Sequence, residues 1–155
     1  MPIPITDLLK EEQILLEIAA PNESSALRMV VDSFAGNLAV RDLPGFYNEL
    51  LEREKIQSTA SGNGIAFPHA RTDLVDDLVL AIGRIPAGVP FGEKKELVHL
   101  MFVIGTPKRL VRDYLVCIGA LARILRNGER REALMNVTDR GEFLEILRNA
   151  LAENL

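Results

Sequence analysis

His69 is the residue whose type and setting first suggest chemistry. It is one of two histidines in 155 residues and follows a short apolar run in GNGIAFPHAR, residues 62–71. Pro68 fixes its own backbone angle and pushes Phe67 toward extended geometry, so the direction of the chain at His69 is tightly set. The pattern predicts an imidazole placed where an extended segment stops and the backbone turns.

Residues on both sides of His69 favour an anion as its neighbour. Gly62 and Gly64, which bracket Asn63, allow backbone N–H groups to approach a negative group closely. Thr72 is expected to cap a helical turn just after the histidine and to add further N–H donors. Two interpretations of the imidazole stay open: a reactive ring beside an anion, or a structural ring bonded to the backbone of a turn.

The other candidate ligands are too scattered to predict a metal site. His99 lies in the apolar run LVHLMFVIG and is expected to be a buried strand residue bonded to a neighbour, and Cys117 is the lone cysteine. Neither His-x-x-x-His nor Cys-x-x-Cys spacing occurs. A metal-dependent hydrolase would have to recruit Asp73, Asp76 and Asp77, which are expected to form a solvated loop. Because a serine elbow and a P-loop are also missing from the sequence, no metal and no cofactor are expected.

Arg53, in LLEREKIQST, lies at the end of a predicted helix. One interpretation is an exposed side chain paired with Glu49, Glu52 or Glu54. The other requires the loop to His69 to fold back beside the helix end, because a permanently charged guanidinium would then face the imidazole. The local sequence leaves both open.

The composition limits the function classes. The length is that of one domain, so residues 1–155 are expected to form a single domain. Lysine and arginine number 18 against 22 acidic residues, a net charge of −4, which argues against a nucleic-acid-binding protein because such proteins carry a basic excess. The sequence shows no signal-peptide pattern and no run of about 18 apolar residues, so membrane insertion is not expected. A single cysteine fits a reducing cytoplasm.

Helix and strand patterns interleave along the chain without a regular βαβ repeat. Asn22 is a suitable N-cap for a helix over 23–35, and another helix is expected after Asp42 with Pro44 in its first turn. Strands are predicted over 13–18, 65–67, 78–85 and 97–104, a surface connection over 86–96, and helices over 6–10, 110–126, 129–136 and 138–147. The inward positions expected for 110–126 are Leu115, Ile118, Leu121, Ala122 and Leu125. This order predicts an α/β protein of the α+β type, with a mixed β-sheet sandwiched between helical layers.

The stretch LLEREKIQSTASGNGIAFPHAR resembles the active-site region of a known family. It is similar to the IIA domains of the fructose/mannitol class in the bacterial phosphoenolpyruvate-dependent phosphotransferase system (PTS), a class that includes the nitrogen-regulatory IIA proteins. LVHLMFVIGTP and YLVCIGALARIL extend the resemblance over nearly the whole chain. The resemblance implies a mixed sheet between helical layers, in agreement with the element order.

The resemblance also implies a role for His69. In this family the histidine of the PH pair accepts a phosphoryl group from the phosphohistidine of a small carrier, HPr, and a nearby arginine corresponds to Arg53. Attack on phosphorus needs an unprotonated ring nitrogen. Because charge spreads over the phosphoryl oxygens in the transition state, positioning and electrostatics matter more than a metal. Thr59 and the residues from Gly62 to Gly64 are expected to supply hydroxyl and backbone donors.

The sequence departs from the family pattern near the expected site. Tyr114 stands where many members carry a second histidine, and Ala70 and Arg71 stand where glycine and lysine are common. Tyrosine donates a hydrogen bond but carries no charge. The departures therefore favour a regulatory or divergent member over a fast sugar carrier.

The functions implied by the resemblance differ in the partner. A phosphocarrier receives phosphate from HPr and passes it to a IIB domain. A IIA-like regulatory module instead docks on a transporter, channel or kinase, and phosphorylation changes its surface by roughly two negative charges. A metal-dependent hydrolase is the third and weakest interpretation.

Overall fold

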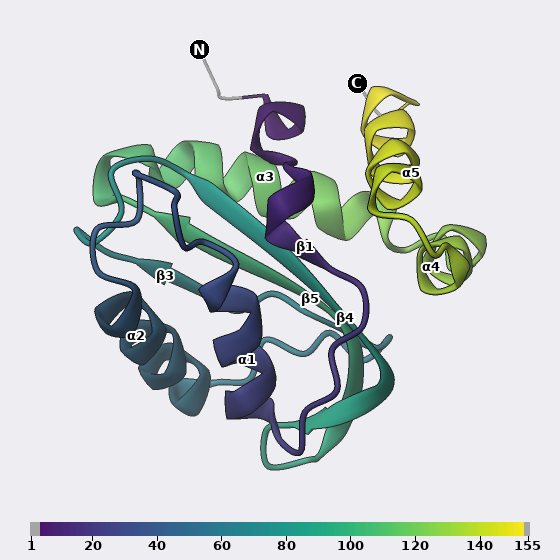
Figure 1. The fold of residues 1–155 in the computed structure, drawn as a ribbon, viewed down its shortest axis with the longest axis horizontal. Helices are drawn as coiled ribbons and strands as arrows, with labels where there is room; N and C mark the ends of the chain where they lie inside the picture. Colours follow the sequence, from purple (N-terminus) through teal and green to yellow (C-terminus); the bar gives the residue numbers. More distant parts are fainter. Residues whose placement is uncertain (1–3, 154–155) are drawn as a thin grey trace.

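The computed structural model describes residues 4–153 and places helices on both faces of a mixed β-sheet (Figure 1). Its strands are β1 (Ile14–Leu15), β2 (Ile65–Ala66), β3 (His69–Arg71), β4 (Val79–Phe91) and β5 (Glu96–Thr106). The order is β1-β4-β5-β2, and β3 also pairs with β5. The long strands β4 and β5 run antiparallel to each other. The short strands pair in parallel, β1 with β4, and β2 and β3 with β5. The predicted mixed sheet is confirmed.

Two helical layers enclose the sheet. The helices are α1 (Glu23–Asp32), α2 (Leu43–Ile56), α3 (Val111–Ile124), α4 (Gly128–Asn136) and α5 (Arg140–Glu153), and the 3-10 turns are η1 (Ile5–Leu8), η2 (Glu11–Gln13) and η3 (Lys108–Leu110). The helices α1 and α2 cover one face, and α3 and α5 cover the other (Figure 1). Each face has its own buried cluster, with Phe34 and Phe46 on the first and Phe102 and Phe143 on the second. The predicted layer arrangement is confirmed.

No helix within residues 4–153 combines the length and the apolar character needed to cross a membrane.

The caps predicted from the sequence start α1 and α2. The Asn22 side chain accepts a hydrogen bond from Ser25 N at 2.9 Å, and Asp42 Oδ1 accepts one from Gly45 N at 3.0 Å. Both bonds satisfy N–H groups that the first turn of a helix leaves without intrahelical partners. Phe46 of α2 is fully buried, so this ring anchors the helix in the core beside the sheet.

The two long strands extend further than expected. Segment 86–96, predicted to be a surface connection, belongs largely to the β4–β5 hairpin, and the turn is confined to 92–95. The ladder shifts register between Arg84 and Val89 and resumes with Val89 opposite Val98. Gly88 adopts a φ of +80° in this irregular stretch, a backbone angle that glycine allows. The prediction of a surface connection is wrong because the bulge lets the sheet continue past the glycines and prolines.

The buried face of α3 differs in part from the one expected. Leu121 and Leu125 are buried as predicted, and Ile118 and Ala122 are partly buried. Tyr114, Cys117, Leu121 and Ile124 point inward. Leu115, expected inside, is 58% exposed. Tyr114 and Cys117 are less hydrophobic than leucine and isoleucine. The sequence pattern therefore placed the first two inward positions of the helix one residue too late, at Leu115 and Ile118.

Several element boundaries also move. The strand expected over 13–18 is limited to β1, since Gln13 ends η2 and its side chain donates to Leu80 O at 2.9 Å. The last helix starts at Arg140 rather than 138, because Asp139 Oδ1 accepts from Gly141 N at 2.6 Å, and it continues to Glu153.

The chain continues as a strand at His69 instead of turning. Residues His69–Arg71 form β3 and pair with Ile104, Gly105 and Thr106 of β5, which satisfies backbone groups that a turn would leave free. The helical turn expected at Thr72 is also wrong, because the Thr72 hydroxyl accepts a hydrogen bond from Leu74 N at 3.1 Å in a tight turn. Alternate residues of a strand point to opposite sides, so His69 and Arg71 share one side of β3.

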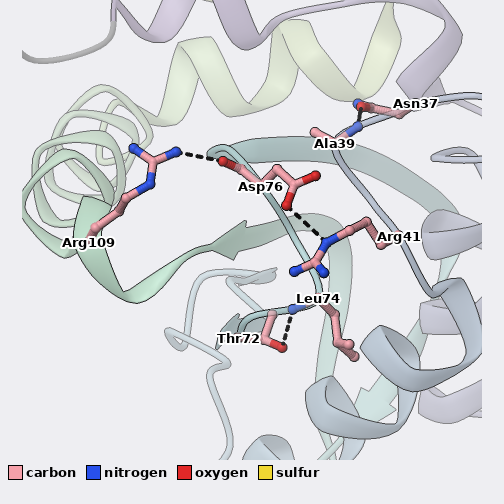
Figure 2. A network of polar contacts seen from close by, with 7 residues as sticks. All are labelled: Asn37, Ala39, Arg41, Thr72, Leu74, Asp76 and Arg109. Carbon is pink, nitrogen blue, oxygen red and sulfur yellow. Dashed lines mark hydrogen bonds and ion pairs between the residues drawn. The ribbon is translucent and has the colours of Figure 1, made fainter.

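Figure 2 shows a polar network around the connection that follows β3. Arg41 Nε lies 2.9 Å from Asp76 Oδ1, and Arg109 Nη2 donates to the Asp76 carbonyl at 2.7 Å. Arg41 precedes the N-cap of α2, Asp76 lies between β3 and β4, and Arg109 lies in η3, just before α3. Exposed ion pairs stabilise a fold only slightly. The network mainly holds three loop segments next to one another: the one before α2, the one after β3 and the one before α3.

Candidate functional site

A surface pocket of about 510 Å³ lies between α2 and β3. It is lined by Asn48, Glu49, Glu52, Arg53 and Ile56 from α2 and by His69, Ala70 and Arg71 from β3. The helix end carrying Arg53 and the strand carrying His69 therefore meet. The structure selects the second sequence interpretation of Arg53, in which the loop folds back.

Small residues allow α2 to approach β3 closely. Ala70 of β3 is buried and pairs with Gly105 of β5. A Cβ atom at Gly105 would lie 2.6 Å from Phe46 Cζ of α2, a distance at which the ring or the helix must shift. The missing side chain at Gly105 thus lets the start of α2 pack closely on β5, the strand that pairs with β3.

The ring of His69 is held in one tautomer. Its Nδ1 lies 2.9 Å from the carbonyl oxygen of Phe67. A carbonyl can only accept a hydrogen bond, so Nδ1 carries the proton and Nε2 carries the lone pair. The ring is partly buried and lies 5.2 Å from the ring of Tyr114, centroid to centroid, with a 34° angle between the planes. The nitrogen able to act as a nucleophile is Nε2.

Burial and charge keep this imidazole neutral. Burial lowers the pKa of His69, the hydrogen bond to Phe67 opposes that shift, and the charge of Arg53 lowers the pKa further. The ring is therefore uncharged at neutral pH. Burial also raises the pKa of Tyr114, against the opposing charges of Arg53 and Arg71, so the phenol keeps its proton and remains a hydrogen-bond donor.

Arg53 is positioned by the end of its own helix. Its Nη1 donates to Gln57 O at 2.9 Å, just beyond the last residue of α2. This is its one hydrogen bond among residues 4–153, so the other guanidinium donors remain available in the pocket. The arrangement can present a fixed positive charge to an anion held near His69.

Thr59 is engaged with a residue that the sequence interpretation missed. Glu54, 7% exposed, accepts hydrogen bonds from Thr59 N at 3.1 Å and from the Thr59 hydroxyl. Burial raises the pKa of Glu54 in spite of these bonds. The Thr59 hydroxyl therefore donates to a carboxyl group outside the pocket lining, and its expected role as a donor to a phosphoryl group remains a prediction. The only indication of this contact in the sequence was the position of Glu54, an acidic residue just before a polar loop.

Of the glycine pair, Gly64 lies against the other histidine. Gly62 and Gly64 have φ values of +86° and +83°, and Asn63 Oδ1 accepts a hydrogen bond from Ser61 Oγ at 2.6 Å. The carbonyl of Gly64 accepts one from His99 N at 2.8 Å. None of the three central residues lines the pocket, so anion binding by this loop also stays a prediction.

Other residues raised by the sequence have structural partners. His99 Nδ1 lies 3.1 Å from Ile85 O, which confirms the expected hydrogen bond to a neighbour, but the side chain is partly buried rather than buried as expected. Burial raises the pKa of Cys117 to about 12, so its thiol is a packing group. Among residues 4–153, no three histidine, cysteine, aspartate or glutamate side chains gather as metal ligands would.

Comparisons with known proteins agree on one family. The model of the family described as "Phosphoenolpyruvate-dependent sugar phosphotransferase system, EIIA 2" matches residues 7–150. A PTS system mannitol-specific EIICBA component from Pasteurella multocida is 30% identical over 91% of this chain, which spans only 23% of that relative.

Two solved structures show the same fold. The nitrogen regulatory protein IIA-Ntr from Neisseria meningitidis superposes with a TM-score of 0.85 at 25% identity, over 92% of this chain and 98% of that one. The complex of enzyme IIAMTL and phosphorylated enzyme IIBMTL from Escherichia coli gives 0.79 at 26% identity, over 91% and 97%.

Proposed function

The chain belongs to the EIIA 2 family of the phosphoenolpyruvate-dependent sugar phosphotransferase system, and from that premise we propose that it carries a phosphoryl group on His69. The single observation that supports this most is the setting of the ring. Its Nδ1 is bound to the Phe67 carbonyl and its Nε2 is free, in a pocket that also contains Arg53. These are the features a histidine nucleophile needs.

The proposed step is an in-line transfer between two imidazoles. Nε2 of His69 attacks the phosphorus of a phosphohistidine on an HPr-like carrier; the new N–P bond forms as the donor's N–P bond breaks, and the donor ring keeps that electron pair. The proton stays on Nδ1 and is donated in a hydrogen bond to the Phe67 carbonyl, which stabilises the positive charge that the His69 ring gains. Arg53 binds the phosphoryl oxygens, where charge is concentrated in the transition state.

Exposed apolar side chains offer a surface for the protein that delivers or accepts the phosphoryl group. Ile56 lines the pocket and is 81% exposed. Leu115 and Val116, which follow Tyr114 on α3, are 58% and 53% exposed. Apolar residues beside a small polar site are typical of protein docking surfaces. The mannitol relative, solved together with its phosphorylated IIB enzyme, supports a IIB domain as the acceptor.

Reconstituted phosphorylation tests the proposal. The protein is incubated with phosphoenolpyruvate, enzyme I and HPr, and the product is examined for an acid-labile, base-stable phosphate. We expect one phosphate per chain in the wild type and none in His69→Gln. Labelling that survives this substitution would remove His69 as the acceptor.

A regulatory function of the same site is the second candidate. It is supported by the TM-score of 0.85 with the nitrogen regulatory protein IIA-Ntr. In this version the phosphate on His69 adds roughly two negative charges and alters docking on a transporter, channel or kinase. Capture of a partner by His69→Ala but not by phosphorylated wild type, with no transfer to any IIB domain, would favour regulation over transport.

A further inference from the structure

Arg71 presents an unpaired guanidinium at the edge of the pocket. Its side chain is exposed and lines the same pocket as His69 and Arg53. Across residues 4–153 the structure gives it no ion pair and no hydrogen bond from its side chain, whereas Arg41 and Arg84 both have acidic partners. A cation held beside a nucleophile and left without a partner is available to an anionic ligand.

The strand fixes where Arg71 can reach. Its backbone pairs with Thr106 and that of His69 pairs with Ile104, so the two side chains occupy positions i and i+2 of a regular strand. Such residues lie roughly 7 Å apart on one side of a strand, while the residue between them, Ala70, is buried in the core. An arginine side chain spans this distance, so its guanidinium can meet a group attached to His69 Nε2.

Arg53 alone does not neutralise the negative charge that a phosphoryl group brings into the pocket. A phosphoryl group adds about two negative charges. Arg53 supplies one positive charge and shares its guanidinium with Gln57 O, and Tyr114 supplies none. The charges of both Arg53 and Arg71 lower the pKa of Tyr114, which indicates that the two guanidiniums act on the same end of the site.

We propose that Arg71 is a second phosphoryl-binding residue, whose guanidinium donates hydrogen bonds to the phosphoryl oxygens once His69 Nε2 is phosphorylated. The inference rests on the proposed function in that His69 carries the phosphate. It differs in assigning Arg71 to the phosphorylated state itself, independently of which protein delivers the phosphoryl group.

Phosphoramidate, a small phosphoryl donor, allows the role of Arg71 to be tested separately from phosphoryl delivery by HPr. Its N–P bond breaks as the His69 Nε2–P bond forms, and ammonia leaves with a proton from water. The ¹⁵N signal of Arg71 Nε is followed by NMR before and after this reaction. We expect it to shift and to exchange more slowly with water in the phosphoprotein, while Arg148, exposed on α5, is unchanged. An Arg71 signal that ignores phosphorylation overturns the proposal.

Urea unfolding of variants gives the second measurement. The unfolding equilibrium constant is compared before and after phosphorylation in wild type, Arg71→Gln, Arg71→Lys and the matched charge control Arg148→Gln. Loss of Arg71 should reduce the stabilisation that accompanies phosphorylation by about three- to tenfold in that constant, with Lys intermediate and Arg148→Gln like wild type. Equal values for Arg71→Gln and Arg148→Gln contradict the proposal.

The outcomes distinguish the two failures. If HPr labels His69 but Arg71→Gln behaves like the control, the phosphocarrier function stands and the Arg71 inference is wrong. If only phosphoramidate labels His69 and the Arg71 signal responds, the inference stands and delivery by HPr is wrong. Failure of both HPr and phosphoramidate to modify His69 overturns both, because both require an accessible Nε2.

Discussion

The two histidine regions are alike in backbone setting and different in chemistry. Both rings place Nδ1 against a backbone carbonyl, Phe67 O for His69 and Ile85 O for His99. His69 lies in a pocket with a guanidinium, whereas His99 packs against glycines: a Cβ at Gly88 would lie 2.9 Å from its Cε1. An imidazole with a fixed tautomer thus becomes a candidate nucleophile only when its other nitrogen faces an open pocket that also contains a cation.

Replacing each histidine by glutamine has the largest expected contrast. His69→Gln should abolish phosphate incorporation, because the amide has no nucleophilic ring nitrogen. His99→Gln should keep it within about twofold of wild type, since a glutamine N–H can still donate to a backbone carbonyl. The measurement is the initial rate of phosphorylation from phosphorylated HPr.

Circular dichroism of both variants serves as the folding control. If His99→Gln folds normally and yet accepts no phosphate, the contrast between the two regions is lost.

Removing the guanidinium should have the next largest effect. Arg53→Gln is expected to slow phosphorylation of His69 on the order of a hundredfold, because a preorganised charge near the developing phosphoryl charge is lost. Arg53→Lys should recover part of the rate, since an ammonium keeps the charge but not the planar fork. Rates come from rapid quench with phosphorylated HPr.

The matched control for this arginine is Arg28→Gln on α1, another helix of the same sheet face. Its partners are the exposed Asp32 and the ring of Tyr47, whose centroid lies 5.2 Å from Arg28 Cζ; neither lines the pocket, so little change in rate is expected. Equal rates for Arg53→Gln and Arg28→Gln would exclude Arg53 from the transfer step.

Local patterns in the sequence were sufficient to predict the fold class, but they left open whether Arg53 meets His69. Caps such as Asn22 and the 3.6-residue spacing of buried positions act within a few residues, so they are visible without a structure. The family resemblance added what periodicity does not contain, namely which helix end lies beside which strand.

Long-range contacts account for the features that the sequence did not predict. Arg84 lies in the strand predicted over 78–85, and nothing in the sequence indicated that it would be buried. It is 3% exposed and donates to Leu16 O and to Leu134 O and Val137 O at the end of α4. The burial of Glu54 and the pairing of β3 with β5 likewise depend on segments distant in sequence or on how a loop folds. Such partners carry no local signal.

A side chain added at Gly88 should destabilise the region around His99 without changing the rate at which His69 is phosphorylated. Gly88→Ala would place a methyl group 2.7 Å from Leu97 Cγ at a φ of +80°. We expect a loss of about 1–3 kcal/mol in the free energy of unfolding, measured in urea, and an unchanged phosphorylation rate. The control is Gly119→Ala in α3, which has open space around it and should stabilise the helix by about 0.5–1 kcal/mol.

Slower phosphorylation in Gly88→Ala, at a urea concentration where it remains folded, would show that the two histidine regions are coupled.

The smallest expected effect is a shift in the pH dependence of His69. Its pKa lies below the usual 6.5 because of burial, and the charge of Arg53 adds to that lowering. Phosphorylation by phosphoramidate should therefore begin to decline at a lower pH than for a histidine of ordinary pKa, because protonation removes the nucleophilic lone pair. Arg53→Gln removes one cause of the lowering, so its decline should begin at a higher pH than in wild type. An NMR titration in the His99→Gln background, where a single imidazole remains, measures the same pKa directly. A pKa of His69 at or above 6.5 in the wild type would mean that the ring is not desolvated as the structure has it, and the contrast with the second histidine would then rest on the guanidinium alone.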